Sequence, residues 1–404
     1  MVNSLMLANG IGGASQNLYA QFLYRISEIK KKYKLTDCHI ALFCKPNYLS
    51  STSYQKFRKM FFDEFYYVDG ILFNASEFEN VSDKWGISFS IFGCGENLDS
   101  NNFKYGLIDN VDGEIISIGN KIVYNADGIV TASEWAKKEV KKLKTFDEPN
   151  VSSAIKIRSS TSDTRGMNFI GNLGYFMNAG NNVYMNVQKV SLFSTAYGNG
   201  HGHGISKTNF TKCTALFASR KLIEGNWIND KDEYLAPDES HPLYTEFVND
   251  SIVYSLFHSS SNQSSLRQIE YKGKFWDIKN EFFWMNKTEI MELANDCGFD
   301  KCYNDARISE QRFVFNTLKG LELSQEAQAV LDKACSIVRN TFKFRQIFDD
   351  AHSEYQLMNW DCGWYQIKAV AKEYAAADYA EFRKLFKALS DNMRPMVYEL
   401  GFLK

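Results

Sequence analysis

The segment that decides the fold is GILFNASEFENVSDKWGISFSIF, residues 70–92, which predicts two strands joined by a polar loop. Residues 71–73 form a short apolar run of the kind found in buried strands. Further along, Ile87, Phe89 and Ile91 alternate with serines, a period of two that is typical of a strand with one face against a core. We therefore expect a hairpin that turns these three apolar side chains inward.

The loop between the two strands carries a large aromatic side chain, Phe78, followed by Trp85 and Gly86. A large aromatic on a loop at the edge of a sheet exposes apolar surface, and such surface commonly contacts a ligand or a partner. Phe78 is therefore the first candidate for a functional residue.

Upstream of the hairpin, the sequence predicts two helices and one strand. Residues 16–33 read as a helix that Ser15 could cap, residues 39–43 as a strand, and residues 53–65 as a second helix. The apolar positions at helical spacing in the first helix are Leu18, Phe22, Ile26 and Ile29. The order helix, strand, helix, strand, strand predicts an α/β sheet closed by an antiparallel hairpin. Three strands in about 95 residues are fewer than the five or more of a complete doubly wound sheet.

The rest of the chain predicts an α+β unit that ends in helices, with a domain boundary near residue 130. Residues 97–130 read as a crossover, and residues 132–144 as a basic helix. Residues 152–284 contain short β-like runs between turns. Residues 324–348 and 367–389 have long helical patterns.

Composition describes a folded protein of 404 residues, long enough for two domains. The net charge of -2 does not exclude nucleic acid, because a local basic face is enough to bind it. The 8 cysteines form no CxxC pair and predict reduced, partly buried thiols in a cytoplasmic protein. No apolar stretch is long enough to span a membrane, and the first 15 residues lack the basic start and apolar core expected of a signal peptide.

Motifs for common chemistry are missing from the sequence. No GxGxxG loop follows a strand, and there is no nucleophile elbow, HExxH or Walker loop. His201 and His203 lie in the glycine loop at residues 198–204, but a stable metal site needs a third and a fourth ligand. We favour a loop that contacts a partner, such as a backbone phosphate.

A polar run at residues 259–267, SSSNQSSLR, offers candidate DNA contacts. Asn and Gln can read adenine, Arg can read guanine, and Ser can bind phosphate. A solvated polar loop is an equally common role for such a run. The basic segment at residues 137–144 could follow a phosphate backbone, although a solvated face is the usual role. The aromatic groups at residues 277–285 and 360–368 read as core and as a packing turn before a helix.

Extended phrases of the chain resemble a known family, the adenine-N6 DNA methyltransferases of the type I-like and type IIG-like restriction–modification group. ASQNLYAQFLYRI, IALFCKPNYL and the 70–92 segment resemble the late part of the catalytic domain. Phrases that look like the specificity-bearing C-terminal half of the same group are FASRKLIEGNWINDKDEYLAP, NDSIVYSLFHSSSNQSSLR, WDIKNEFFWM, LMNWDCGWYQIK and VYELGFL.

The resemblance implies an enzyme that transfers a methyl group from S-adenosylmethionine to an adenine flipped out of double-stranded DNA. It implies residues 1–130 as the C-terminal part of a Rossmann-like methyltransferase sheet, and residues 131–404 as a target-recognition and helical domain. Phe78 matches the later aromatic that packs on the flipped base. The residues expected to contact DNA are Arg220, Ser261, Asn262, Gln263 and Arg267.

The sequence departs from the family in two motifs. It contains neither Asn-Pro-Pro-Tyr/Phe, which holds the adenine amine, nor the glycine-rich motif for S-adenosylmethionine. Both would lie upstream of Met1, so we expect little catalysis from the chain alone. Two other hypotheses remain: a non-catalytic DNA-binding specificity subunit that acts with a separate methyltransferase or restriction subunit, and a remnant without present function.

Overall fold

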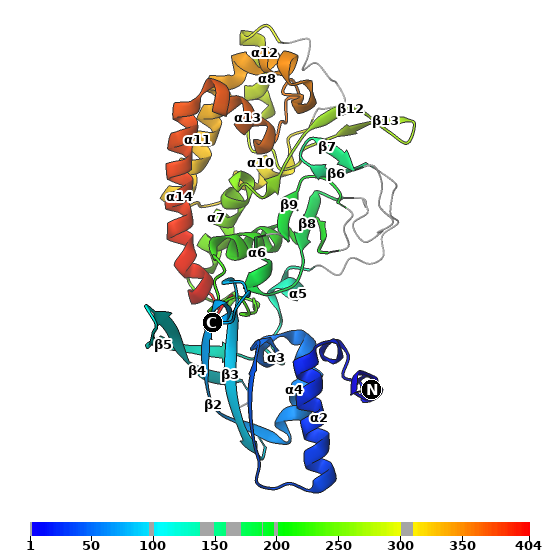
Figure 1. The fold of residues 1–404 in the computed structure, drawn as a ribbon. Coiled ribbons are helices and arrows are strands. Elements are labelled where there is room, and N and C mark those ends of the chain that lie inside the picture. Colours follow the sequence, from blue (N-terminus) through cyan, green and yellow to red (C-terminus); the bar gives the residue numbers. More distant parts are fainter. Residues whose placement is uncertain are drawn as a thin grey trace.

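The computed structural model shows a mixed α/β protein whose first third, coloured blue to cyan, lies below the rest of the chain in Figure 1. The buried apolar side chains form two clusters, one between Met6 and Val123 and the other between Ala132 and Leu403. The structure describes residues 2–96, 101–137, 149–158, 171–187, 189–197, 201–299 and 310–404.

A five-stranded sheet organises the first third. Its strands are β1 (His39–Cys44), β2 (Phe65–Asn74), β3 (Gly86–Cys94), β4 (Asn102–Val111) and β5 (Glu114–Tyr124), in the order β1-β3-β2-β4-β5. β3 is antiparallel to both β1 and β2, and β2 is parallel to β4. The strands β1, β2 and β4 therefore run in one direction. The predicted hairpin is confirmed, with Asn74 opposite Gly86 at its closed end.

The predicted crossover at residues 97–130 is wrong, because β4 and β5 pair along their whole length as a second antiparallel hairpin. Its turn is Asp112–Gly113, and both residues have positive φ, 53° and 90°. An Asp-Gly pair is the strongest short signal for such a turn, because a type I′ turn needs positive φ at both central positions. This signal was present in the sequence.

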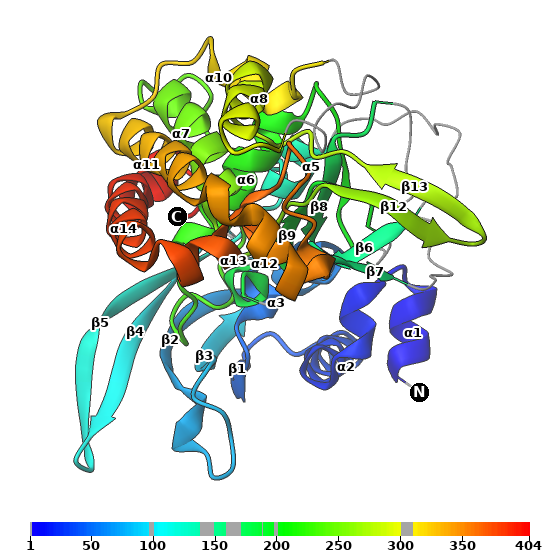
Figure 2. The ribbon, with the colours of Figure 1, turned by 90° about the horizontal axis from the view of Figure 1, so that it is seen from above.

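Helices cover one face of the sheet, as Figure 2 shows. They are α1 (Val2–Ala8), α2 (Leu18–Tyr33), α3 (Asn47–Ser50) and α4 (Gln55–Phe62). Ser15 does not cap α2: it lies in a 3₁₀ turn, and Asn17 holds the N-cap position. The predicted apolar face of α2 is also wrong, because Leu18 and Phe22 are 70% and 67% exposed. The buried side chains of α2 are Ala20, Leu23, Tyr24 and Ser27.

The inward face of β3 is the opposite of the one predicted. Ser88 and Ser90 are fully buried, whereas the alternating apolar side chains of β3 lie on the half-buried outer face. Ser90 Oγ lies 2.8 Å from the hydroxyl of Tyr105 and accepts a hydrogen bond from the Tyr48 hydroxyl at 3.3 Å. Ser88 donates to the carbonyl of Cys44 at 2.9 Å. Small hydroxyl side chains fit here because tyrosine rings from neighbouring elements fill the space.

The second part of the chain combines short strands with many helices. Its four-stranded sheet has the order β10-β8-β9-β11, formed by β8 (Gly174–Asn178), β9 (Val190–Phe193), β10 (His203–Ile205) and β11 (Ser261–Asn262). Two further hairpins are β6 (Asn150–Ser153) with β7 (Lys156–Arg158), and β12 (Leu266–Tyr271) with β13 (Lys274–Ile278). The helices are α5 (Ala132–Ala136), α6 (Phe210–Leu222), α7 (Tyr244–Phe257), α8 (Lys287–Asp296), α10 (Phe313–Leu318), α11 (Gln325–Thr341), α12 (Arg345–Ala351), α13 (Trp364–Tyr374) and α14 (Ala376–Glu399).

Two sequence predictions in this part fail for local reasons. The apolar run at residues 213–222 reads as a strand but lies in α6, which is buried on nearly all sides. A short apolar run cannot distinguish a buried strand from a buried helix. The two long helical patterns each divide, the first between α11 and α12 and the second between α13 and α14.

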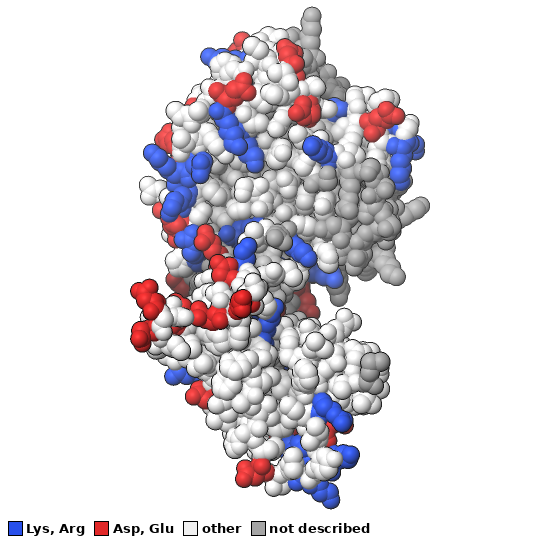
Figure 3. Space-filling view, in the orientation of Figure 1, with Lys and Arg blue, Asp and Glu red and all other residues white. Residues whose placement is uncertain are grey.

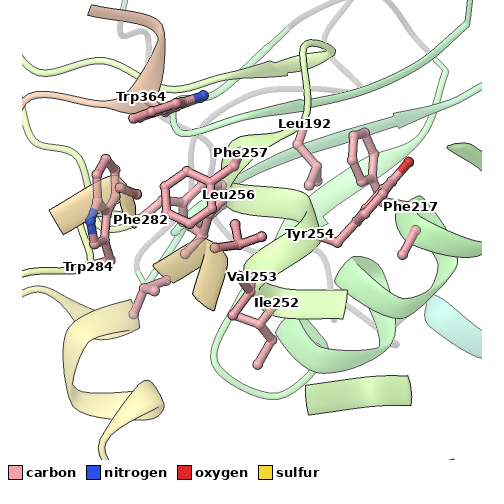
Figure 4. Packing of buried hydrophobic residues seen from close by; sticks show 14 of the residues in the cluster. Leu192, Phe217, Ile252, Val253, Tyr254, Leu256, Phe257, Phe282, Trp284 and Trp364 are labelled. Atoms are coloured by element: carbon pink, nitrogen blue, oxygen red, sulfur yellow. The ribbon is translucent and has the colours of Figure 1, made fainter. Parts of the chain in front are cut away.

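Aromatic side chains from α7, α13 and the α7–α8 connection meet in the second core (Figure 4). The ring of Phe257 lies 4.9 Å from that of Trp284 and 5.1 Å from that of Trp364, both edge-on. The core interpretation is confirmed for the aromatic cluster of residues 277–285, which is Phe282, Phe283 and Trp284, and so is that of residues 360–368 as a packing turn before a helix.

Candidate functional site

The strands β1 and β2 end at the same edge of the five-stranded sheet. Cys44 and Leu72 both lie opposite Ser88 of β3, so the loops after β1 and β2 emerge at the same edge, on either side of β3. In open α/β sheets, ligands bind outside the carboxyl ends of the strands. This edge of the sheet is therefore the first place to look for a site.

Four phenylalanines gather beside this edge, on the open face of the sheet, and we call them the phenylalanine cluster: Phe43, Phe73, Phe78 and Phe89. The ring of Phe78 lies 5.9 Å from that of Phe73 and 6.2 Å from that of Phe43, the latter edge-on. The ring of Phe43 lies 4.5 Å from that of Phe89. Phe43 and Phe78 remain 59% and 43% exposed, so the cluster holds its outer rings in place while leaving them open to a ligand.

A cation and an indole stand next to the cluster. Lys45, directly after β1, places its Nζ 3.1 Å from the centroid of the Trp85 ring, which precedes β3. Burial and, to a smaller extent, the charge of Lys231 lower the pKa of Lys45. Lys231 belongs to the second part of the chain, where residues 223–231 follow α6. The same loop touches the hairpin, because a Cβ on Gly86 would lie only 2.6 Å from the carbonyl oxygen of Trp227.

Arg220 does not reach the surface, contrary to its prediction as a DNA contact. Its side chain is fully buried on α6, and its guanidinium donates to the side-chain oxygen of Asn186 at 2.9 Å and to the carbonyls of Gly180 and Asn182 at 2.9 and 3.1 Å. It also donates to Asn178. Burial lowers its pKa to about 10. Arg220 therefore ties the segment that follows β8, residues 178–186, to α6.

From Ser261 on, the polar run at residues 259–267 is also internal, which contradicts both the DNA-contact and the solvated-loop interpretations for these residues. Ser261 and Gln263 are buried, and Gln263 donates to the carbonyl of Leu256 at 2.6 Å. Asn262 is half-buried in β11 and pairs with β9. Arg267 directs its guanidinium inward, to the buried carboxylate of Asp361. None of these four side chains is placed to read a base.

Asp361 is the centre of a buried polar network. Its Oδ1 accepts from Arg267 Nη2 at 3.0 Å, and its Oδ2 accepts from Arg312 Nε at 2.9 Å and from the backbone N–H of Asn280 at 3.0 Å. Ser265 also donates to Oδ1. Burial by itself raises the pKa of Asp361, but the two guanidinium groups outweigh it and hold that pKa below its usual value. The network joins β12, α10 and the turn before α13.

The histidines of the glycine loop show no metal site. His203 is buried in β10, its Nε2 lies 3.4 Å from Cys213 Sγ, and burial lowers its pKa to about 4. Among the described residues, no group of three or more His, Cys, Asp or Glu side chains could hold a metal ion. The predicted basic helix begins as α5, but residues 138–148 lie outside the described ranges.

Comparison with known proteins gives no family. No protein-family model, curated protein or solved structure matches the chain. A search of the described helices found none with the length and apolar character needed to cross a membrane.

Proposed function

We propose that this chain is part of a site-specific DNA methyltransferase that transfers a methyl group from S-adenosylmethionine to adenine N6. The observation that carries the proposal is the phenylalanine cluster, because Phe78 and Phe43 are exposed beside the carboxyl ends of β1 and β2. The order of elements in the first third, with a hairpin closing an α/β sheet, also supports a Rossmann-like relationship. The matched aromatic of the family resemblance, Phe78, lies in the cluster.

The cluster suits a flipped base for physical reasons. An enzyme that modifies a base inside a duplex must rotate it out of the stack, and the lost stacking has to be replaced. Aromatic side chains replace it in a sequence-tolerant way, at about 1–3 kcal/mol per base. The edge-on contact with Phe43 orients the Phe78 ring, so that little side-chain freedom remains to be lost when a base binds.

The proposal includes a partner. The family resemblance assigns the methyl donor and the adenine amine to motifs that residues 1–404 do not contain. We propose that another methyltransferase polypeptide supplies them, while this chain supplies the stacking aromatic and DNA contacts. In the second candidate function, a non-catalytic specificity subunit, the chain would bind DNA but Phe78 would not affect the methylation rate.

The test measures N6-methyladenine in the genome of cells that carry the native gene, because every partner of the chain is present there. Deleting the gene should remove N6-methyladenine from at least one sequence motif in the genome. Phe78→Ala should slow remethylation of that motif after replication by about 5- to 150-fold, the factor that corresponds to 1–3 kcal/mol. Phe275→Ala is the matched control, because Phe275 is an exposed phenylalanine on β13.

Each result of this test has a definite meaning. If deletion leaves every methylated motif intact, the methyltransferase proposal is wrong. If deletion removes methylation at a motif but the Phe78→Ala variant still supports methylation there at the normal rate, Phe78 does not stack on the flipped base. The chain then acts in methylation as a specificity subunit would.

A further inference from the structure

A broad groove in the second part of the chain is lined by none of the four residues of the phenylalanine cluster. Its volume is about 1270 Å³, and it lies between α14, the end of α7 and the loop after α6. Buried Phe257, Trp364 and Phe382 form part of its floor. The floor of the groove is therefore formed by side chains of the second core.

One side of the groove is a row of cations on α14. Arg383, Lys384, Lys387 and Arg394 line it, and they are the Lys and Arg residues of that helix. Figure 3 shows Lys and Arg gathered along the edge of the molecule that α14 occupies in Figure 1. At 1.5 Å per residue, the row from Arg383 to Arg394 spans about 16 Å. This length matches about five nucleotide steps along one strand of duplex DNA.

The positive charge of the groove is only partly balanced by the protein. Five cationic side chains line it, the four on α14 and Lys368, against two acidic ones, Glu224 and Asp391. Asp391 already pairs with both Lys387 and Arg394. Arg383, Lys384 and Lys368 have no acidic partner among the described residues. A surplus of this kind, concentrated in a concave surface, attracts a polyanion.

Two further side chains of the groove have a pKa that is lowered first by burial and then by neighbouring positive charges. Burial and then the charge of Lys372 lower the pKa of Lys368. Burial, followed by the charges of Lys221 and Lys368, lowers the pKa of His258 to about 3. His258 is therefore neutral at physiological pH, and the charge of the groove comes from its lysines and arginines.

We propose that this groove holds the sugar-phosphate backbone of one strand of the duplex, an inference that rests on the proposed function in DNA methylation. The loop at residues 223–229 relates the two sites. Its Glu224, Asn226 and Asn229 line the groove, and its Trp227 lies against Gly86 at the closed end of the β2–β3 hairpin. A duplex bound along α14 thus lies on one side of this loop and the phenylalanine cluster on the other.

The test compares two full-length variants that lose the same charge. The groove variant is Arg383→Gln/Lys384→Gln/Lys387→Gln, and the control is Lys32→Gln/Lys56→Gln/Lys59→Gln, three exposed lysines of the first third. Binding to a labelled duplex of about 30 base pairs is measured at several salt concentrations. Three lost phosphate contacts should make the slope of log K against log[salt] shallower by about 2.7 and weaken binding at least about tenfold. The control should retain the wild-type slope.

Each alternative outcome is decisive. Equal loss in both variants means a general charge effect and overturns the groove proposal. An unchanged slope in the groove variant overturns it too, while genomic methylation still decides the proposed function separately. If the wild-type chain binds polyglutamate through the groove more tightly than DNA, the occupant is an acidic polypeptide and the proposal is wrong. Should the triple variant unfold, Arg383→Gln/Lys384→Gln is used, because neither side chain has an acidic partner among the described residues, and its expected slope change is about 1.8.

Discussion

Replacing Asp361 by Asn tests whether the buried network holds the second part of the chain together. Asn has nearly the same shape, but its amide NH₂ would face a guanidinium N–H of Arg267 or Arg312, donor against donor. It would also leave Arg267 without its counter-ion and Arg312 with only the carboxylate of Glu281 at 3.9 Å, in a site where Asp361 is fully buried. Breaking a buried ion pair in this way costs about 3–5 kcal/mol. That is a large part of the roughly 5–15 kcal/mol by which proteins are stable.

Urea unfolding followed by tryptophan fluorescence measures this loss. Trp360 is a local reporter, since the guanidinium carbon of Arg312 lies 4.6 Å from its ring centroid. With a denaturant slope of about 3 kcal/mol per M, the midpoint should fall by at least about 1 M. Asp332→Asn is the matched control, because Asp332 is exposed on α11 and, among the described residues, accepts a side-chain hydrogen bond only from Gln328. A shift below about 0.3 M for Asp361→Asn would refute the role given to the network.

The same variant has a pH signature. The pKa of Asp361 is lower in the folded chain than in the unfolded chain. Its contribution to the free energy of unfolding is therefore complete above about pH 4, the unfolded value, and is lost as the pH falls further toward the folded pKa. The variant should lose less stability than the wild type between about pH 4 and pH 2. Parallel curves in that range would show that the Asp361 carboxylate is not selectively stabilised by folding.

Two further predictions concern the contact between the two parts of the chain and the groove. Gly86→Ala should destabilise the chain by about 1–3 kcal/mol, because the added Cβ would lie 2.6 Å from the carbonyl oxygen of Trp227. Gly106→Ala is the control and should cost less, because its Cβ would lie 3.8 Å from its nearest neighbour. Equal thermal unfolding curves for the two variants would contradict this prediction. The pKa of His258 is lowered to about 3, so its contribution to the free energy of unfolding is complete above about pH 6.5 and declines as the pH falls toward 3. His258→Asn should therefore make the stability less dependent on pH between about pH 6.5 and pH 4. Urea midpoints measured across that range check this.

Local pattern predicted the longer helices and the strands up to residue 94 but missed the β4–β5 hairpin, and it did not show which way the predicted elements face. The hairpin at residues 70–92 could be predicted because its two apolar runs flank a polar loop. Its inward face could not, because Tyr48 and Tyr105 come from elements far from β3 in sequence and supply both the volume and the hydroxyls that match buried serines. The predicted apolar face of α2 was wrong for a similar reason: the face that packs on the core includes Ala20 and Ser27, whose small side chains do not stand out in a hydrophobic pattern.

Of the residues that form the candidate site, the sequence identified only one. Phe78 was identified from its loop, whereas its neighbours Phe43 and Phe89 come from strands that spacing alone does not bring together. Polar side chains misled the prediction, because a run such as residues 259–267 looks the same whether water or a buried carboxylate satisfies it. The groove cations lie on a helix that the sequence did predict in part, but the concave surface beside them depends on α7 and the loop after α6.

The hydroxyl layer beneath β3 also fixes the alignment of the hairpin. Both faces of β3 carry apolar side chains, so hydrophobicity alone would tolerate a shift of one residue, which exchanges the two faces of a strand. Such a shift would place Phe89 or Ile91 where Ser90 now meets the hydroxyls of Tyr48 and Tyr105. Each buried hydroxyl left without a partner costs about 1–3 kcal/mol. The serines therefore fix the register of β3 against its neighbouring strands, and this register holds the loop that carries Phe78 in one position at the end of the sheet.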